Sequence, residues 1–357
     1  MAHHRIAAIP ADGIGPEVIS AGLQVLDALS KRMTNLTFEV TEFDWGSRRF
    51  ETEGSLMPED GLNQLQNFDA IFFGAVGAPN VPDHISLWGL RLPICQGFDQ
   101  FANVRPTRIL PGIPSPLAGK GPGDLDWVII RENSEGEYSG AGGRVHRGMP
   151  EEVATEVSIF TRSGVERVMR FAFEIARNRP RRQLTVVTKS NAQRHGMVLC
   201  DEIAAEIASE FPDVSWDRIL VDAMTVRMTS HPETLDTIVA TNLHADILSD
   251  LAGALAGSIG VAPTANIDPT RRNPSMFEPI HGSAFDIAGK GIANPVATFW
   301  TACQMLDHLD EQDAALRLMG AVESVCAAGI LTPDVGGTST TADVTAAVID
   351  SIRGAND

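Results

Sequence analysis

Short apolar segments rich in β-branched residues alternate with longer amphipathic segments along this chain. The segments that resemble strands are residues 6–9, 38–43, 70–76, 127–130, 184–188, 219–221 and 238–241. Between them, apolar residues recur at helical spacing, as in residues 18–29 and 165–176. Strands that alternate with helices predict an α/β fold with a mostly parallel sheet and helices on both of its faces.

Two stretches depart from this alternation. Residues 106–126 are rich in proline and glycine and predict a long loop near a domain boundary. Residues 139–162 contain several glycines and then an alternating segment at 153–160. This pattern predicts a hairpin or arm on the surface, and a mobile loop is the alternative.

The composition narrows the class of protein. A length of 357 residues suggests two domains or one large α/β unit. The net charge of −18 argues against nucleic acid and anionic membranes as partners, because both would repel the chain. The cysteines form no metal-binding spacing, and neither residues 1–10 nor the uncharged stretch 251–267 suits a signal peptide or a membrane span. We therefore expect a soluble cytoplasmic protein with a sizeable core.

Polar residues follow consecutive predicted strands. They include Arg131, Lys189, Asp222 and Asn242. In open parallel sheets, ligands bind outside the carboxyl ends of the strands, so these side chains are expected to converge on one crevice. Each residue alone is more typical of a helix cap or a surface charge, but the four together indicate a site.

Asp246 and Asp250 lie four positions apart and would share one face of a helix. The apolar neighbours Ile247, Leu248 and Leu251 suggest that this helix is largely buried. Paired carboxylates in such a setting need a counter-charge, which a divalent cation with oxygen ligands would supply. Asp222 is a candidate third ligand. The alternative, which the spacing alone slightly favours, is a solvated acidic face.

No dinucleotide-binding motif of the G-x-G-x-x-G type occurs in the sequence, and the glycine-rich turn at residues 12–17 is a weak signal by itself. Residues 278–295 contain more candidate binding residues, and the small residues among them would let a ligand approach the backbone. Asp286 could accept a hydrogen bond from a ribose hydroxyl. This segment is therefore a candidate loop site.

Taken together, the motifs resemble the β-decarboxylating dehydrogenase family, which includes isopropylmalate, isocitrate, homoisocitrate, D-malate and tartrate dehydrogenases. Their order and spacing make the resemblance specific over essentially the whole chain. Residues 132–138 and 87–89 look most like the tartrate and D-malate branch. The matching motifs are residues 10–17, 102–106, 130–140, 188–191, 221–224, 242–250, 278–283 and 334–341.

The resemblance implies a two-domain, doubly wound open sheet of the isopropylmalate dehydrogenase type, which is not a Rossmann fold. Residues 1–101 and 257–357 would form a large domain on the cofactor side. Residues 102–256 would form a small domain with the dimer interface, and the arm at about 139–162 would clasp the partner subunit.

The resemblance also implies roles for individual residues. Lys189 from the partner subunit and Tyr138 would act as the acid/base pair, while Arg105 and Arg131 would bind substrate carboxylates. The expected Mg²⁺ or Mn²⁺ ligands, one of them from the partner subunit, are Asp222, Asp246 and Asp250. The expected NAD contacts are His281, Gly282, Ser283, Asp286 and Asn294, with Asn191 facing the nicotinamide. NAD is expected over NADP, because Asp286 would repel a 2′-phosphate.

One departure from the family concerns a substrate arginine. The family usually has an arginine ten positions before Arg105, where this chain has Cys95. Arg91 could substitute if its segment is helical, although Pro93 leaves that geometry open. Trp88 would leave little room for a large C3 substituent and so favours a substrate of the malate or tartrate kind, and packing in the core is the alternative.

The sequence thus predicts NAD- and metal-dependent oxidative decarboxylation of a small 2-hydroxy diacid by a homodimer with shared sites. The alternatives are non-decarboxylating oxidation of a related 2-hydroxy acid, 3-isopropylmalate dehydrogenase activity, and a catalytically silent regulatory subunit. The presence of Lys189, Tyr138 and the three aspartates argues against the silent subunit, which would not need them.

Overall fold

The computed structural model describes residues 2–354 and divides the chain into two compact units. Unit 1 comprises Met1–Gln100, Arg105–Leu125 and Ala252–Asp357, and unit 2 comprises Phe101–Val104 and Asp126–Leu251. Both ends of the chain therefore belong to unit 1. Compared with the expected ranges, the stretch 105–125 lies in unit 1 instead of the middle unit.

The strands of unit 1 form a mostly parallel sheet in the order β2-β1-β3-β12-β11, in which only the β11–β12 pair is antiparallel among the pairings described. Their bounds are β1 (Ala2–Ala11), β2 (Leu36–Glu42), β3 (Ala70–Ala75), β11 (Pro263–Ile267) and β12 (Ser275–Pro279). The sequence pattern predicted β1, β2 and β3 but missed β11 and β12, which are short and contain proline.

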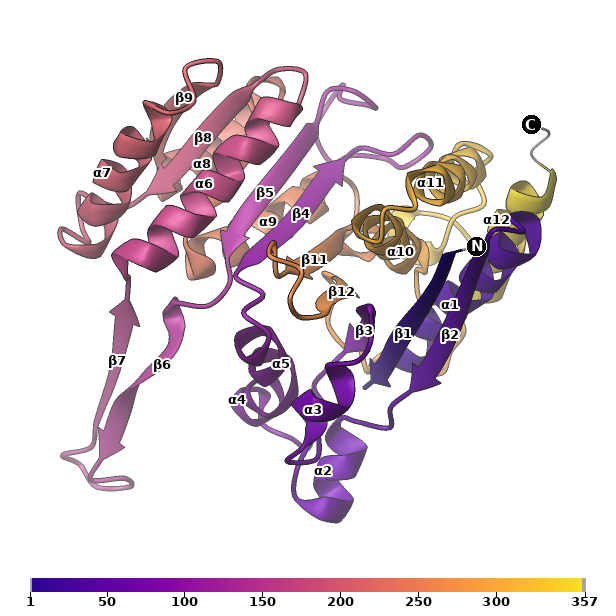
Figure 1. Cartoon of the computed structure of the whole chain (residues 1–357), viewed down its shortest axis with the longest axis horizontal. Helices are drawn as coiled ribbons and strands as arrows, with labels where there is room; N and C mark the ends of the chain where they lie inside the picture. The colour runs from indigo at the N-terminus through magenta and orange to yellow at the C-terminus, as the bar shows by residue number, and fades with distance from the viewer. Residues whose placement is uncertain (1, 355–357) are drawn as a thin grey trace. The chain divides into compact units, whose positions relative to one another are not determined.

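Helices cover both faces of this sheet (Figure 1). On one face, a Cβ at Gly22 would lie 2.6 Å from the Phe72 ring, so glycine allows α1 to approach β3 closely. On the other face, Ile9 and Phe73 pack with Trp45 and Leu90. The helices of unit 1 are α1 (Gly15–Arg32), α2 (Ser47–Glu53), α3 (Gly61–Leu65), α4 (Asp83–Ser86), the π-helix η1 (Leu87–Arg91), α5 (Leu92–Gly97), η3 (Ile259–Val261), α10 (Val296–His308), α11 (Gln312–Ala327), η4 (Pro333–Val335) and α12 (Thr341–Gly354).

Unit 2 contains a parallel sheet in the order β5-β10-β8-β9. Its strands are β5 (Asp126–Glu132), β8 (Gln183–Thr188), β9 (Ser215–Leu220) and β10 (Thr237–Ala240), and its helices are α6 (Arg162–Asn178), α7 (Gly196–Ala208), α8 (Val221–Ser230) and η2 (Pro232–Thr234). The strand β4 (Ala102–Arg108) and the helix α9 (Asn242–Leu255) each contain a boundary between the two units.

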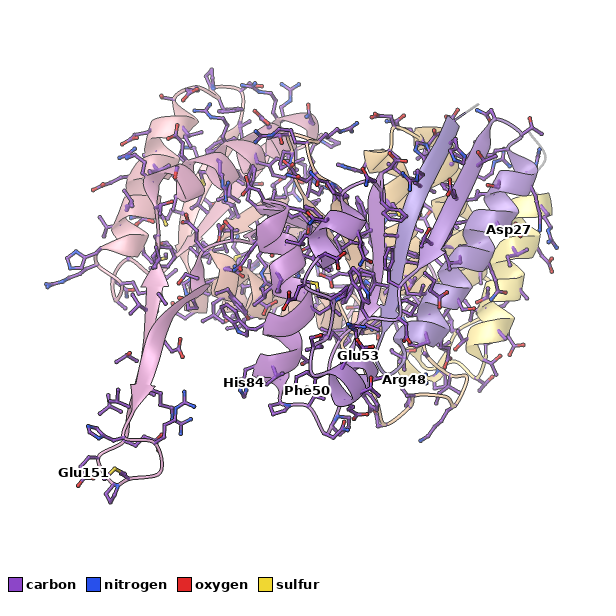
Figure 2. All side chains as sticks on the ribbon, turned by 60° about the horizontal axis from the view of Figure 1, so that its bottom comes forward. Asp27, Arg48, Phe50, Glu53, His84 and Glu151 are labelled. Carbon is purple, nitrogen blue, oxygen red and sulfur yellow. The ribbon has the colours of Figure 1, made fainter. Side chains whose placement is uncertain are left out.

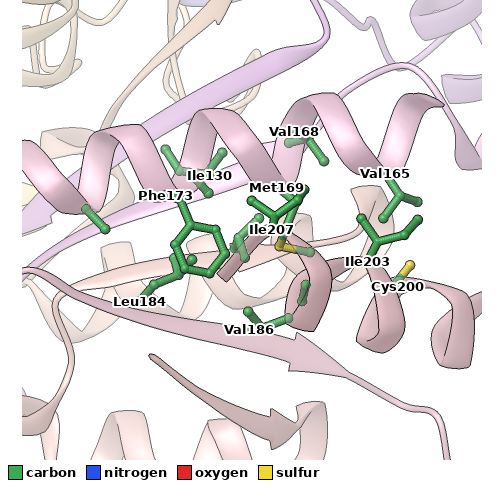
Figure 3. Packing of buried hydrophobic residues seen from close by; sticks show 14 of the residues in the cluster. Ile130, Val165, Val168, Met169, Phe173, Leu184, Val186, Cys200, Ile203 and Ile207 are labelled. Carbon is green, nitrogen blue, oxygen red and sulfur yellow. The ribbon is translucent and has the colours of Figure 1, made fainter. Parts of the chain in front are cut away.

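The core of unit 2 explains why α6 has its apolar spacing. Val165, Met169 and Phe173 of α6 pack with Ile130 of β5 and Ile203 of α7 in one buried cluster (Figure 3). Burial of these side chains is the main favourable contribution to folding of this unit. The helix is therefore held against the sheet, and the carboxyl ends of β5, β8 and β10 are fixed beside it.

Residues 136–159 form a two-stranded antiparallel ribbon made of β6 (Gly136–Val145) and β7 (Val153–Ile159). The ribbon extends from the body of unit 2, and Glu151 lies at its tip (Figure 2). Every residue of β7 is exposed, including its apolar side chains Val153, Val157 and Ile159. A ribbon with this much exposed apolar surface is typical of a segment that packs against another chain.

Within the described residues, no helix is both long enough and apolar enough to cross a membrane. The α/β class predicted from the sequence is confirmed.

Candidate active site

Arg131 at the end of β5 is the centre of a buried polar cluster in unit 2. Its Nε donates a hydrogen bond of 2.8 Å to Oδ1 of Asn242, and its guanidinium pairs with Asp246. The Tyr138 hydroxyl donates to Oδ2 of the same Asp246 at 3.0 Å. The Arg131 guanidinium also lies over the Tyr138 ring, 5.2 Å from its centroid. Three residues predicted from the sequence, Arg131, Tyr138 and Asp246, are thus brought together.

Asn242, predicted from the sequence only as one of the polar residues that follow strands, is also a member of this cluster. It is only 1% exposed, and while its Oδ1 accepts from Arg131, its Nδ2 donates to the backbone carbonyl of Glu135 at 3.2 Å. An amide supplies one acceptor and one donor, so it satisfies both neighbours at once. Asn242 therefore joins Arg131 to the loop that leads into β6 and Tyr138.

Glu132 holds the loop that leads into β6 through hydrogen bonds to Ser134 and Glu135. This buried carboxyl accepts hydrogen bonds from the Ser134 hydroxyl and from the backbone N–H groups of Ser134 and Glu135. Burial raises the pKa of Glu132, although these hydrogen bonds oppose the rise. The turn before Tyr138 is consequently held by side chains and does not depend on strand pairing alone.

Lys189 and Asp222 form a second cluster in unit 2. The Lys189 ammonium lies 2.6 Å from Oδ1 of Asp222, and this hydrogen bond lowers the pKa of the Asp222 carboxyl. The Asp222 side chain is 67% exposed at the start of α8. The predicted base and one predicted metal ligand are therefore direct neighbours within one chain.

Asp246 and Asp250 lie one turn apart on α9, as the spacing predicted. Asp246 is partly buried, and Asp250 is exposed. Residues 2–354 contain no group of three or more His, Cys, Asp or Glu side chains that could hold a metal ion. The carboxylate oxygens of Asp246 and Asp250 are of the kind that hard cations prefer as ligands.

The environment of α9 differs from the expectation in one respect. Leu248 is fully buried and Leu251 is half-buried, as predicted. Ile247, however, is 57% exposed, so the expectation that it is buried is wrong for the single chain. It is one position from Leu248, about 100° around the helix, and its exposure leaves an apolar side chain on the surface of this chain.

The predicted cofactor segment lies in unit 1 and packs against the glycine-rich turn at residues 12–15. The backbone N–H of Ile14 donates to the Ser283 carbonyl at 2.8 Å. Gly13 has φ +60, and a Cβ there would lie 1.9 Å from the Ser283 carbonyl oxygen, so only glycine fits. Gly282 has open space around its Cα, and Asp286 is exposed. The glycine-rich turn at residues 12–17 and the segment 278–295 are therefore parts of one loop cluster.

His281 and Asn294 have different environments within this loop cluster. His281 is buried, which lowers its pKa, and its Nε2 has no hydrogen-bond partner among residues 2–354. A neutral ring nitrogen without a partner is unusual for a buried polar atom, and it distinguishes His281 from the other buried polar side chains of this loop cluster within residues 2–354. The Asn294 amide, in contrast, donates to Asp334 at 3.0 Å and accepts from the Val296 backbone at 3.0 Å. The Asn294 side chain therefore makes its hydrogen bonds within unit 1, to Asp334 and to the Val296 backbone.

The predicted substrate residues of unit 1 lie on β4 and on the helical stretch 83–97. Arg105 is buried on β4, and Cys95 is buried in α5. Arg91 does lie in a helical segment, because Pro93 occupies the first turn of α5 and is tolerated there. Trp88 is 40% exposed, so it is not a core residue.

Comparison with known proteins assigns the chain to a family. The model of the isocitrate/isopropylmalate dehydrogenase family matches residues 5–351. The chain belongs to this family. The prediction of family and of fold class made from the motifs is therefore confirmed.

Relatives within this family point to one branch. The chain is 75% identical over 356 residues to a probable tartrate dehydrogenase/decarboxylase of Agrobacterium vitis, covering 100% of this chain and 99% of that protein. It is 49% identical over 352 residues to the decarboxylating D-malate dehydrogenase of Escherichia coli K12, covering 96% and 97%. The crystal structure of isocitrate dehydrogenase from Methylococcus capsulatus matches with a TM-score of 0.88 at 35% identity, covering 98% of this chain and 99% of that one.

Proposed function

We propose that this member of the isocitrate/isopropylmalate dehydrogenase family is an NAD- and divalent-metal-dependent enzyme that oxidatively decarboxylates a four-carbon 2-hydroxy diacid such as tartrate or D-malate. The relatives named for tartrate and D-malate support this substrate class. The observation that carries the proposal is the cluster of Arg131, Tyr138 and Asp246, which places a cation, a phenol and a carboxylate in mutual contact.

Arg131 and Arg105 bind the substrate carboxylates in this proposal. Arg131 is suited to the role because Asn242 and Asp246 hold its guanidinium in one orientation before the substrate arrives. The exposed indole of Trp88 limits the size of the C3 substituent, which favours four-carbon acids over isopropylmalate or isocitrate.

The acid/base work is assigned to Lys189 and Tyr138. Lys189, as the neutral amine, would take the proton of the C2 hydroxyl, directly or through water, and NAD, when bound, would supply the hydride acceptor. After CO₂ is lost, Tyr138 donates its hydroxyl proton to C3. The hydroxyl already donates its hydrogen bond to Asp246, so the proton points toward the carboxylates of α9.

Asp246 and Asp250 of one chain, together with Asp222 of the partner subunit, are the proposed ligands of Mg²⁺ or Mn²⁺. Their carboxylate oxygens suit these hard cations. When bound, the cation supplies Lewis acidity toward the substrate oxygens. Arg131 pairs with Asp246 and so neutralises part of the charge of the two α9 carboxylates.

NAD is assigned to the loop cluster of unit 1, with His281, Gly282, Ser283, Asp286 and Asn294, and with Asn191 at the nicotinamide. His281 has an Nε2 without a hydrogen-bond partner among residues 2–354, and Gly282 has open space beside its backbone. Asp286 is exposed and would accept hydrogen bonds from ribose hydroxyls. The Asn294 amide serves the cofactor indirectly, because its hydrogen bonds to Asp334 and Val296 hold the loop cluster together.

A homodimer completes the proposed site. Apolar side chains are exposed on α8, on α9 and along the ribbon, among them Val226, Ile247 and Val157. Large exposed apolar side chains on these elements are the support for an interface between chains. The four cysteines, all within the described residues, are buried free thiols, which suits a reducing cytoplasm.

Tyr138→Phe tests this assignment, with D-malate, NAD and Mn²⁺ as substrates and cofactors. The variant keeps the ring beside Arg131 and removes only the proton donor, so kcat should fall about 10²–10⁴-fold. Ser139→Ala is the matched control, because it removes a neighbouring hydroxyl that bonds to the Val157 carbonyl. An unchanged kcat in Tyr138→Phe would remove the phenol from the mechanism.

A further inference from the structure

Arg91 makes a buried ion pair within unit 1. Its Nε and one terminal nitrogen lie 2.8 and 2.7 Å from Oε1 of Glu278, and the same terminal nitrogen donates to Oδ1 of Asn266 at 3.1 Å. The side chains of Arg91 and Glu278 are only 11% and 7% exposed. A guanidinium in such an environment is fixed in its orientation by its partners.

The partners of Arg91 lie on the two antiparallel strands β11 and β12. Asn266 on β11 donates from Nδ2 to Oε1 of Glu278 at 2.8 Å and to the Met276 carbonyl at 3.3 Å. Oε1 of Glu278 therefore receives donors from both Arg91 and Asn266. This arrangement fixes the Glu278 side chain at the end of β12.

Glu278 lies immediately before the proposed cofactor segment. β12 ends at Pro279, and His281 follows two residues later. Any displacement of Glu278 would therefore be transmitted to His281 and Gly282 through a very short stretch of backbone. The ion pair holds the start of the segment that is assigned to NAD.

Arg91, the partner of Glu278 in the ion pair, lies in the same helical turn as Trp88. Residues Leu87–Arg91 form a π-helix, with the Leu92 N–H donating to the Leu87 carbonyl. On a regular α-helix, Trp88 and Arg91 would be neighbours on one face. Here Trp88 is exposed while Arg91 is buried, and such π-turns are frequent at functional sites.

We infer that Arg91 is a positioning residue that couples the helical turn of Trp88 to the NAD-binding loop through Glu278, and that it is not itself a ligand of the substrate. The inference rests on the proposed function for the roles of Trp88 and of the NAD-binding loop. Nε and one terminal nitrogen of Arg91, the edge of the guanidinium that would clamp a carboxylate through two bonds, already donate to Glu278 and Asn266. A substrate carboxylate would have to displace one of these partners to bind that edge, so in this inference Arg91 does not replace the arginine missing at position 95.

Two variants test the inference from the two ends of the ion pair. Arg91→Lys keeps the charge but lacks the Nε donor, so the contact of two nitrogens with Glu278 is lost, and Glu278→Gln removes the charge of the acceptor. Arg108→Lys is the matched control, because Arg108 pairs with Glu323 at 2.7 Å elsewhere in unit 1 and is partly exposed. The Kd of NAD without substrate, the KM of D-malate and the thermal midpoint are measured for each protein.

We expect Arg91→Lys and Glu278→Gln each to weaken NAD binding about five- to tenfold and to raise the KM of D-malate as well. The double variant should be no worse than the worse single one, because both changes break one contact. For Arg108→Lys, the Kd of NAD and the KM of D-malate should both stay within about twofold of the wild-type values.

A rise in the KM of D-malate with an unchanged Kd of NAD would overturn the inference, because it would make Arg91 a substrate ligand. An unchanged Kd in both variants, or a wild type that does not bind NAD, would also overturn it. The proposed function fails separately, if the wild type binds NAD but oxidises no 2-hydroxy acid. The Kd of NAD still tests the ion pair in that case.

Discussion

The ammonium group of Lys189 lies 2.6 Å from a carboxylate oxygen of Asp222 within one chain. Tyr138 and Arg131 instead contact Asp246, on a different helix of the same unit. The residues proposed for catalysis thus fall into two sets. The first contains the base Lys189 with Asp222, and the second contains the acid Tyr138 with Arg131 and Asp246. If each active site takes one set from each chain of a dimer, Lys189 and Asp222 must always come from the same chain.

Subunit exchange tests this pairing. A Lys189→Ala protein mixed with an Asp250→Asn protein should regain activity, because one of the two sites in each heterodimer combines an intact Lys189 with an intact Asp250. Random exchange should restore about one quarter of the wild-type activity, since half of the dimers are heterodimers with one intact site. Activity is measured after exchange, with heterodimers quantified by tagging.

The control for this exchange is a mixture of Lys189→Ala with Asp222→Asn. Both changes affect the same set, so neither site of the heterodimer is intact and no activity should return. Recovery in this control equal to that of the first mixture would contradict the assignment of Lys189 and Asp222 to one chain.

Metal dependence is expected to follow the aspartates of α9. Asp250→Asn removes one negative oxygen ligand and should weaken Mn²⁺ binding by at least about tenfold, with turnover restored in part by excess metal. Mn²⁺ titration of activity, together with calorimetric binding, measures the effect. Asp313→Asn, on an exposed aspartate of α11, is the control. Full activity of the wild type after complete chelation would show that the metal role is wrong.

Asn242→Asp should impair substrate binding without affecting NAD. The new carboxylate keeps the acceptor for Arg131 but sets an oxygen against the Glu135 carbonyl, in place of the present donor. The loss of this hydrogen bond should cost about 1–3 kcal/mol of stability, and the KM of D-malate should rise.

Thr185→Val is the comparison for Asn242→Asp, because it removes a hydrogen bond of 2.7 Å to Asp217 elsewhere in unit 2. It should lower stability and leave the KM of D-malate unchanged. If both variants changed stability and the KM of D-malate alike, Asn242 would have a structural role alone.

Stability is expected to fall between about pH 6.5 and pH 4, partly because of His308. Burial lowers the pKa of His308 to about 4 in the folded chain, below the value of an unfolded histidine. The unfolded chain therefore binds a proton first, and the stability present above pH 6.5 is lost as the pH falls toward 4.

His308→Gln should flatten this dependence by about 1–3 kcal/mol between pH 7 and pH 4. Urea denaturation at a series of pH values measures it. The contact of the His308 ring with Phe277, at 5.4 Å between centroids, would also be lost in the variant, so the comparison is of slopes with pH and not of stability at one pH. Parallel curves for the two proteins would show that His308 titrates normally.

The periodicity of the sequence was sufficient to predict most of the central strands and the α/β class, because burial on both faces leaves a continuous apolar signature in β3, β5 and β8. The strand β12 escaped prediction, since it is five residues long and contains Ser275, Glu278 and Pro279. The motif residues could be assigned roles because their order resembles a family.

The contacts that position these residues could not be predicted in the same way. Asn242 reaches the Glu135 carbonyl across 107 positions, and Arg91 reaches Glu278 across 187. Such pairings depend on how the chain folds and leave no local pattern. The exposure of Ile247 was missed for a related reason, since apolar neighbours in sequence do not tell which side of a helix packs on the core.

The central claim is tested most directly by following NADH and CO₂ together with a panel of 2-hydroxy acids, NAD and Mn²⁺. The account predicts equal amounts of NADH and CO₂, with kcat/KM higher for D-malate or tartrate than for 3-isopropylmalate or isocitrate. NADH formed without CO₂, or a clear preference for the larger acids, would contradict it.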